Sequence, residues 1–416
     1  MKRRRLTDIV NRSSLCGLAA GALSLALVAP FGYAGEIQER EVPPPRRIEN
    51  PRRVKPTAPI QLPKAFGAVV AFSDMTDGVS DNPHLQIEPN YVSAQRMTDL
   101  GYHGIKLWPR ADVLSDDIRQ VFDNPDLELI VMRPLHGAER EEIADCYFLP
   151  FAYHDYGEIA EKLYENYGDR DVTVVLSNWE TDNQVFGGTC NLLVDCEQSG
   201  SKASRNKVDT YPFFEKEMSD PYSLKDLEVS EVCEDYVLNT RIPFIKNLLE
   251  ERQRGINAAR ARHPDAKLRV YGAVEVTTRG LGTRIPDYDW YALRNLVPDL
   301  DPQPDVISLS YWSRHKVSIE EAIQEIKFHT GFPSNRIYIG EIGTEEKNPG
   351  DQYEVIYENF NRACSNEDVC AGFAWLWLQG WPGKDLGLWV KDENGRPTDV
   401  PKSGVQALTD LQNIYH

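Results

Sequence analysis

The sequence predicts an α/β fold, a single (β/α)8 TIM barrel, from three observations. Apolar runs typical of buried strands alternate with helical segments from residue 65 onward. Eight such runs occur over about 350 residues, which suits one barrel with insertions. No glycine-rich phosphate loop follows the first run, so an open nucleotide-binding sheet lacks its main support.

The expected strands are short and nearly continuous in apolar residues, as is typical of parallel strands buried on both faces. The stretch R-I-Y-I-G-E-I-G-T at 336–344 shows this pattern. The eight strands are expected at 66–72, 104–108, 127–132, 172–178, 268–276, 306–312, 337–342 and 372–378.

The expected helices have amphipathic spacing, and several stop where glycine or proline follows. The first ends at Gly101, the second at Gly168, and the long third stops before Pro264. The helices are expected at 91–100, 157–167, 236–263, 287–296, 319–329, 352–363 and 405–411.

One connection is unusually long. The insertion at 181–235, after the fourth strand, is polar and holds three cysteines, which predicts an ordered functional loop. Beyond residue 34 the chain has six cysteines, an even number that indicates disulfides in an exported protein. The pairs expected from their closeness are Cys190 with Cys196 and Cys364 with Cys370, which leaves Cys146 for Cys233.

The N-terminal region has the features of an export signal. A basic head is followed by an apolar core at 15–28 and a small-residue cleavage pattern that ends at Ala34. We expect residues 1–34 to be a signal peptide, 35–64 a proline- and arginine-rich disordered tether, and 65–416 one catalytic domain. The protein would then be secreted or periplasmic.

The formal net charge of −18 argues against nucleic acid or an anionic membrane surface as the main partner. No segment after the signal is long and apolar enough to cross a bilayer. The default expectation is a soluble monomer.

Two carboxylates fall at the ends of expected strands. Glu341 lies between Gly340 and Gly343 near the end of the seventh strand, and Glu180 follows the fourth. Strands four and seven face each other across a barrel mouth, where reactive groups of this fold gather. Such a pair suits glycosidic bond cleavage, in which one carboxyl protonates the leaving oxygen and the other attacks or activates water.

This arrangement resembles the clan A glycoside hydrolases, which are retaining enzymes on a (β/α)8 barrel. The resemblance rests on four segments: 101–107 with Lys106 where the clan commonly has arginine, Asn178-Trp179-Glu180 with one inserted residue, Ser310-Tyr311-Trp312, and 374–377. It implies that Glu341 is the nucleophile and Glu180 the acid/base. It also implies that Tyr311 bonds the nucleophile and that a tryptophan of the eighth strand floors the sugar site.

Other residues at strand ends are expected to bind a carbohydrate substrate. Aromatic rings stack on sugar faces, and because side chains alternate along a strand, Trp375 and Trp377 are expected to point the same way. The candidate set is Lys106, Trp108, Arg133, His136, Asn178, Trp179, Tyr311, Trp312, Trp375 and Trp377.

Each role has an alternative. Lys106 or Arg133 could hold Glu341 in a purely structural ion pair, and Asp182 or Glu275 could replace Glu180 as the acid/base. Tyr311 could instead be a capped core residue at a strand end. The protein could be a non-catalytic carbohydrate-binding or polysaccharide-processing barrel, or a metal-assisted hydrolase. The last would need a His/Asp ligand set at strand ends, where only His136 lies nearby, so no cofactor or metal is expected.

Overall fold

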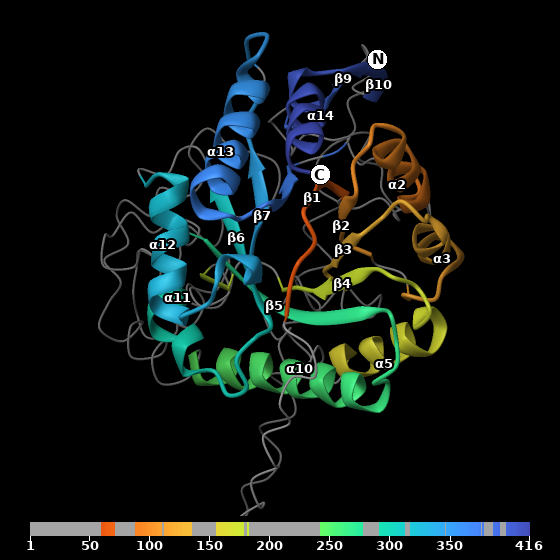
Figure 1. Ribbon diagram of the computed structural model, residues 1–416, viewed down its shortest axis with the longest axis vertical. Helices are drawn as coiled ribbons and strands as arrows, with labels where there is room; N and C mark the ends of the chain where they lie inside the picture. Colours follow the sequence, from red (N-terminus) through yellow and green to blue (C-terminus); the bar gives the residue numbers. More distant parts are fainter. Residues whose placement is uncertain are drawn as a thin grey trace, which may run out of the picture. The chain divides into compact units, whose positions relative to one another are not determined.

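A closed barrel of eight parallel strands forms the core of the protein, with the strands paired in sequence order and β8 paired with β1 (Figure 1). This confirms the predicted (β/α)8 barrel. The computed structural model describes residues 60–70, 88–109, 112–134, 155–178, 181–182, 242–277, 291–312, 317–345, 347–375, 377, 386–391 and 397–416.

The strands lie close to their predicted positions. The longest are β5, β6 and β7, whereas β2, β3, β4 and β8 have four residues each. Their bounds are β1 Ala65–Val70, β2 Gly104–Leu107, β3 Leu129–Met132, β4 Thr173–Leu176, β5 Arg269–Thr277, β6 Val306–Trp312, β7 Ile337–Gly343 and β8 Ala371–Ala374.

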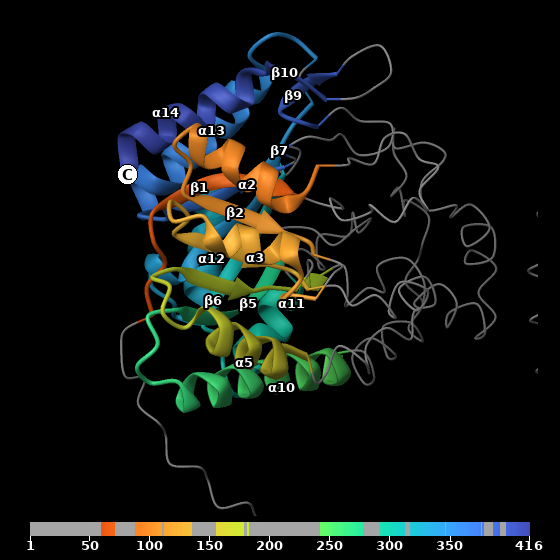
Figure 2. The same cartoon turned by 90° about the vertical axis from the view of Figure 1, so that its right-hand side faces the viewer.

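Helices surround the barrel, and two features were not predicted from the sequence: the short helix α3 and the antiparallel pair β9 (Trp389–Lys391) and β10 (Pro397–Pro401) (Figures 1 and 2). The side chain of Ser115 caps α3 by accepting from the Ile118 N–H. The helices are α2 Asn90–Asp99, α3 Asp116–Asp123, α5 Asp155–Tyr167, α10 Ile242–Arg262, α11 Tyr291–Asn295, α12 Ile319–Thr330, α13 Asp351–Glu367 and α14 Ser403–Tyr415, with 3-10 turns η4 Val297–Asp299 and η5 Ser334–Arg336.

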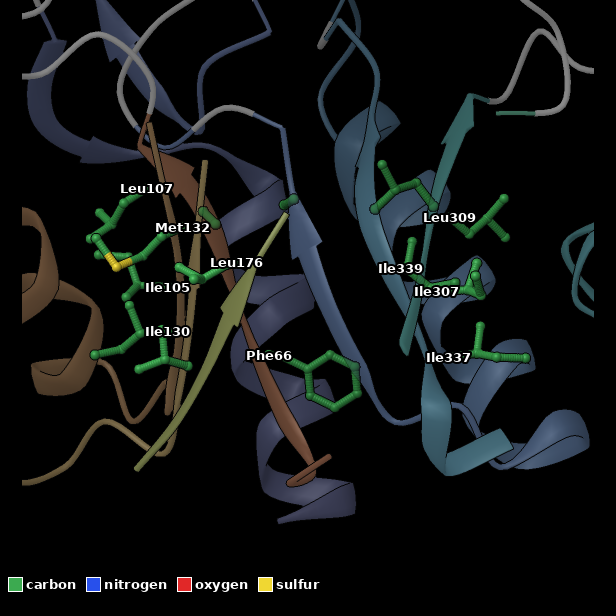
Figure 3. Close-up of a cluster of buried hydrophobic side chains, with 14 of the residues drawn as sticks. Phe66, Ile105, Leu107, Ile130, Met132, Leu176, Ile307, Leu309, Ile337 and Ile339 are labelled. Carbon is green, nitrogen blue, oxygen red and sulfur yellow. The ribbon is translucent and has the colours of Figure 1, made fainter. Parts of the chain in front are cut away.

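The core has two layers because side chains alternate along each strand. On β2, Ile105 and Leu107 point outward to the helices, whereas Lys106 points into the barrel. Figure 3 shows Ile105 and Leu107 with outward side chains of other strands, among them Ile307 and Ile339. Full burial of one such side chain stabilises the fold by about 1.5–3 kcal/mol.

Helices α5 and α10 run side by side and touch through two glycines (Figures 1 and 2). A Cβ atom on Gly255 would lie 2.9 Å from the Cα of Gly157, closer than real Cβ contacts come. The two glycines therefore allow the helices that flank β4 and β5 to approach backbone to backbone.

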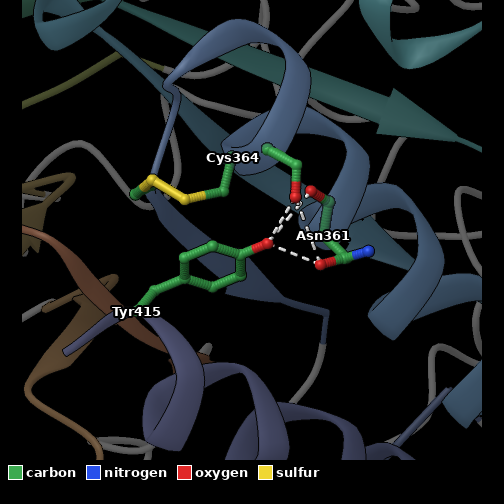
Figure 4. The surroundings of a disulfide bond; sticks show 5 residues. Asn361, Cys364 and Tyr415 are labelled. Carbon is green, nitrogen blue, oxygen red and sulfur yellow. Dashed lines mark hydrogen bonds between the residues drawn. A yellow bond between two sulfur atoms is a disulfide. The ribbon is translucent and has the colours of Figure 1, made fainter.

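The disulfide Cys364–Cys370 joins α13 to the start of β8, with a Cα–Cα distance of 4.6 Å, and confirms the predicted pair. Beside it, the Tyr415 hydroxyl of α14 donates to the Asn361 side chain at 2.5 Å (Figure 4). The other predicted pairs, the insertion at 181–235 beyond Asp182, the signal peptide and the tether fall outside the described residues. No helix within the described ranges has the length and hydropathy of a membrane span.

Candidate active site

The interior of the barrel contains charged as well as apolar side chains. Apolar side chains such as Val131, Val175 and Val306 line much of the interior. Lys106, Glu275 and Glu341 also point into it, and they are between 0 and 2% exposed. Buried charges are costly unless they are paired and hydrogen-bonded, so this cluster requires an explanation.

Glu341 faces the interior because β7 contains a β-bulge. Leu309 of β6 pairs with Ile339, but the next residue, Ser310, pairs with Glu341, so Gly340 is an extra residue. Ile337, Ile339 and Ile342 all point outward to the helices. Strict alternation from Ile339 would also turn residue 341 outward, and the bulge instead turns the carboxylate into the barrel.

Glycine at position 340 is required by close packing. A Cβ atom there would lie 2.0 Å from Ser308 Oγ and 2.8 Å from Glu275 Oε2. Any side chain would displace one of these groups, so the bulge that aims Glu341 depends on this glycine.

Lys106 is the centre of the charged cluster, and its three N–H donors all have acceptors. Its Nζ donates to Glu275 Oε2 at 2.7 Å, to Glu341 Oε1 at 3.0 Å and to the Gly340 carbonyl at 3.2 Å. Ser310 Oγ donates to the other oxygen of Glu341, Oε2, at 3.3 Å. Each oxygen of the Glu341 carboxylate therefore accepts a hydrogen bond, and the two bonds together fix the orientation of the group.

The electrostatics keep the ammonium charged. Burial lowers the pKa of Lys106, but the carboxylates of Glu275 and Glu341 outweigh that effect and raise the pKa of Lys106 above its usual value. Burial lowers the pKa of Arg133, which also lies within the field of Glu275 and Glu341. The ion pair between Glu341 and Lys106, expected from the sequence as a structural alternative for Glu341, is thus present.

Glu275 lies deeper than Glu341 and is fully buried. Besides its contact with Lys106, its Oε2 accepts from Ser308 Oγ at 2.8 Å, while its Oε1 accepts no hydrogen bond among the described residues. The Glu275 backbone N–H donates to Asn178 Oδ1 at 3.1 Å. Burial and the bond to Lys106 make Glu275 a counter-charge below the site.

Three tryptophans, Trp108, Trp312 and Trp375, pack together as an aromatic wall. The ring centroid of Trp375 lies 5.2 Å from that of Trp108 and 6.0 Å from that of Trp312. The Arg133 guanidinium lies over the Trp108 ring at 4.7 Å. Trp312 Nε1 donates to Ser310 Oγ at 3.2 Å, which links the wall to the residue that bonds Glu341. Of the three tryptophans, only Trp312 is partly exposed.

The expected role of Tyr311 as the partner of the nucleophile is wrong. Tyr311 packs in the outer layer, and its hydroxyl donates to the Val317 carbonyl at 2.8 Å. Alternation on β6 turns Tyr311 outward and Ser310 inward. Ser310 thus occupies the place that was expected for the tyrosine, and Ser308 supports Glu275 in the same way.

The expectation that Trp375 and Trp377 point the same way is also wrong. Trp375 belongs to the interior cluster, whereas Trp377 is fully buried in the outer layer. There its ring packs against Trp389 at 5.1 Å. Because β8 ends at Ala374, strand alternation no longer applies at residue 377, and Trp377 is a core residue.

Two residues that follow β4 hold neighbouring elements together. Asp182 Oδ2 accepts from the Thr277 N–H at 3.0 Å, and its Oδ1 accepts from Ala292 N–H of α11 at 2.8 Å. Asn178 Nδ2 donates to Thr181 Oγ1 at 2.9 Å. Both side chains are buried. His136, Trp179 and Glu180 lie outside the residues that the structure describes.

Sequence comparison identifies no relative: neither a scan of protein-family profiles nor a search of curated proteins finds a match. Among solved structures, the chain is similar to a beta-glucosidase from Thermotoga maritima in complex with glucoimidazole, with 15% identity, a TM-score of 0.49, and coverage of 85% of this chain and 99% of that one. It is also similar to a beta-glucosidase in its apo form, with 15% identity, a TM-score of 0.46, and coverage of 78% and 86%.

A third similar structure is a xyloglucan-specific endo-beta-1,4-glucanase from a metagenomic library, in complex with cellotriose. It has 14% identity and a TM-score of 0.43, over 83% of this chain and 95% of that one. At such low identity, no residue of these proteins is matched to a residue of this chain.

Proposed function

We propose that the protein is an exported retaining glycoside hydrolase that cleaves a glycosidic bond in a poly- or oligosaccharide. The observation that carries this proposal is Glu341, a buried carboxylate that a bulge turns into the barrel near the C-terminal end of β7. Lys106 and Ser310 hold its two oxygens. Catalytic groups of this fold gather at that end of the barrel.

In the first step, a carboxylate oxygen of Glu341 attacks the anomeric carbon. The bond from that carbon to the leaving oxygen breaks, and Glu180 gives this oxygen its proton. In the second step, Glu180 takes a proton from water, whose oxygen attacks the same carbon and releases Glu341. A retaining mechanism requires the two carboxyl groups to be about 5–5.5 Å apart.

The contacts of the two alternative acids favour Glu180 for the proton transfer. Both oxygens of Asp182 accept backbone N–H groups, and Glu275 is fully buried against Lys106. A general acid must reach the leaving oxygen. Neither alternative is placed for this, because the first caps a helix and the second lies beneath the site.

Glu275 also balances the charge of Lys106 through the reaction. Once Glu341 forms an ester with the sugar, its negative charge is lost, and a buried ammonium without a counter-ion is costly. The bond of 2.7 Å from Lys106 to Glu275 remains in that intermediate. We therefore expect Glu275 and Lys106 to stay paired throughout the reaction, while Glu341 loses its negative charge in the first step and regains it in the second.

Trp312 is the side chain best placed to contact a sugar ring. It is partly exposed, and its Nε1 is bonded to Ser310 next to Glu341. Trp375 packs against it, and Trp108 packs in turn against Trp375, which limits the movement of Trp312. An indole face can stack against the C–H face of a sugar.

Product analysis on a panel of neutral polysaccharides tests the proposal directly. The anomeric configuration of the first product, followed by NMR, should match that of the substrate. Glu341→Ala should lose all detectable cleavage and fail to form the covalent adduct that the wild-type enzyme forms with a fluorosugar, measured by mass spectrometry.

A matched control is Glu345→Ala, which removes a partly exposed carboxylate four residues further along, paired with Lys347 at 3.3 Å. This variant should keep wild-type activity. Full activity in Glu341→Ala would overturn the assignment. Sugar binding without any release of reducing ends would instead favour the non-catalytic alternative.

Export and a monomeric state are part of the same proposal. The basic head, the apolar core and the cleavage pattern before residue 35 support export, as does the disulfide Cys364–Cys370. N-terminal sequencing of the processed protein should begin after Ala34, and sedimentation should give the mass of one chain. Recovery of the uncleaved chain in the cytoplasm would contradict export.

A further inference from the structure

The protein has three described His–carboxylate pairs on its surface, and one of them differs from the other two. His263 lies 2.8 Å from Glu161, and His329 lies 3.3 Å from Glu325. The third pair, His416 with Glu128 at 3.0 Å, has a second imidazole beside it. His103 stacks on His416 with ring centroids 3.9 Å apart.

The three side chains of this group are brought together by elements that are far apart in the sequence. His103 directly precedes β2, Glu128 directly precedes β3, and His416 follows α14. One possible ligand atom from each residue lies within 4.8 Å of those of the other two. Two imidazoles and one carboxylate are a ligand set typical of zinc and related metals.

The backbone holds the first two of these residues in place. The N–H groups of Glu128 and Leu129 both donate to the His103 carbonyl, at 2.9 and 3.1 Å. This places His103 and Glu128 on neighbouring strand starts, so their relative positions do not depend on flexible loops. A rigid pair of ligands reduces the entropy that metal binding would cost.

A backbone contact also fixes the orientation of the His103 ring. Its Nδ1 lies 2.7 Å from the Asp126 carbonyl oxygen. A carbonyl only accepts, so Nδ1 carries the proton and a neutral His103 presents the lone pair of Nε2. A backbone carbonyl that fixes the tautomer in this way is the usual support of a metal-binding histidine.

We propose that His103, Glu128 and His416 bind a divalent transition-metal ion of the zinc type. The ring of His416 would leave its stack on His103 to coordinate. That stack and the partly exposed ion pair are both weak interactions, so metal–ligand bonds can replace them. The site lies at the strand starts, whereas Glu341 lies near the end of β7, so the ion ties α14 to β2 and β3 and takes no part in catalysis.

Calorimetric titration with zinc chloride tests the site on the full mature chain, with any affinity tag removed. His416→Ala and Glu128→Gln should each weaken zinc binding at least about tenfold. The control His329→Ala removes an imidazole paired with a carboxylate but with no second imidazole, and it should leave the affinity unchanged.

Thermal unfolding supplies a second readout. Zinc should raise the melting temperature of the wild type and of His329→Ala in a concentration-dependent way, and not that of His416→Ala. A chelator should remove the shift without changing kcat. In chelator, His416→Ala should unfold only slightly below the wild type, because His416 is exposed and the variant loses only its ring stack and its ion pair. No saturable binding, or equal loss of binding in His329→Ala and His416→Ala, would overturn the proposal.

Discussion

The two sides of the barrel are built differently. Strands β2, β3 and β4 have four residues each and pair residue for residue, as in Lys106 with Val131 and Val131 with Val175. Strands β5, β6 and β7 have seven to nine residues, and the register between β6 and β7 shifts at the bulge. The buried carboxylates Glu275 and Glu341 and the serines Ser308 and Ser310, which bond to them, lie on the longer strands.

The two sides of the barrel therefore contribute differently to the candidate active site. The regular strands contribute one charged side chain to the interior, Lys106, beside apolar ones such as Val131 and Val175. The longer strands add one residue out of register and thereby bring Glu341 to that charge. A regular ladder fixes distances, whereas a bulge changes which side chains face inward.

The largest expected effect comes from removing the charge that joins the two sides. Lys106→Met leaves Glu275 and Glu341 buried without their shared cation, and we expect a loss of about 3–5 kcal/mol in the free energy of unfolding, measured by urea titration. The double variant Lys106→Met with Glu275→Leu should recover much of this stability but no activity.

Val131→Ala is the matched control, because Val131 is the interior neighbour of Lys106 on β3. It should cost roughly 1–3 kcal/mol through a small cavity and leave the activity per folded molecule unchanged. A loss below about 1 kcal/mol in Lys106→Met, by contrast, would mean that the ion pairs do not stabilise the barrel.

A smaller effect is expected from the bulge itself. Gly340→Ala places a Cβ atom against Ser308 Oγ, and we expect it to cost about 1–3 kcal/mol of stability. The displacement of Glu341 should lower kcat about a hundredfold. The added change Ser308→Ala removes the clashing oxygen and should recover part of the stability. Wild-type activity in Gly340→Ala would show that the bulge does not position the carboxylate.

The smallest expected effect is a pH dependence from the interior. Burial raises the pKa of Tyr338 to about 12, and the carboxylates raise that of Lys106. Above about pH 10 the folded state therefore binds protons that the unfolded state has released, so stability is present below that pH and falls above it. Tyr338→Phe should make this fall shallower by up to about 1.4 kcal/mol per pH unit, measured by urea titration between pH 9 and 11. An unchanged slope would contradict the shift.

The fold followed from periodicity, since strands such as Val306–Trp312 and Ile337–Gly343 lie within a residue or two of their predicted bounds. Helix α12 also lies close to its predicted bounds, and the structure adds its caps: a capping box joins Ser318 and Glu321, and the C-cap Gly331 has φ 68°. Helix α3 was missed because eight residues are too few for a clear period.

The site was predicted in part. The place of Glu341 near the end of β7 was predicted, and its catalytic role stays a prediction. Tyr311 was assigned as the partner of Glu341, although alternation turns it outward and Ser310 inward. The isoleucines at 337, 339 and 342 already showed the phase change of the bulge. The group of His103, Glu128 and His416 had no such signal, since its members meet only in the folded chain.

The seam between the first and last strands determines when the barrel can close. Phe66 N–H of β1 donates to Gln412 Oε1 of α14 at 3.2 Å, and the Tyr102 hydroxyl donates to the Val405 carbonyl at 2.7 Å. During synthesis, β1 can pair with β8 only after the ribosome has made the chain as far as β8. Contacts between residues this far apart in the sequence slow folding.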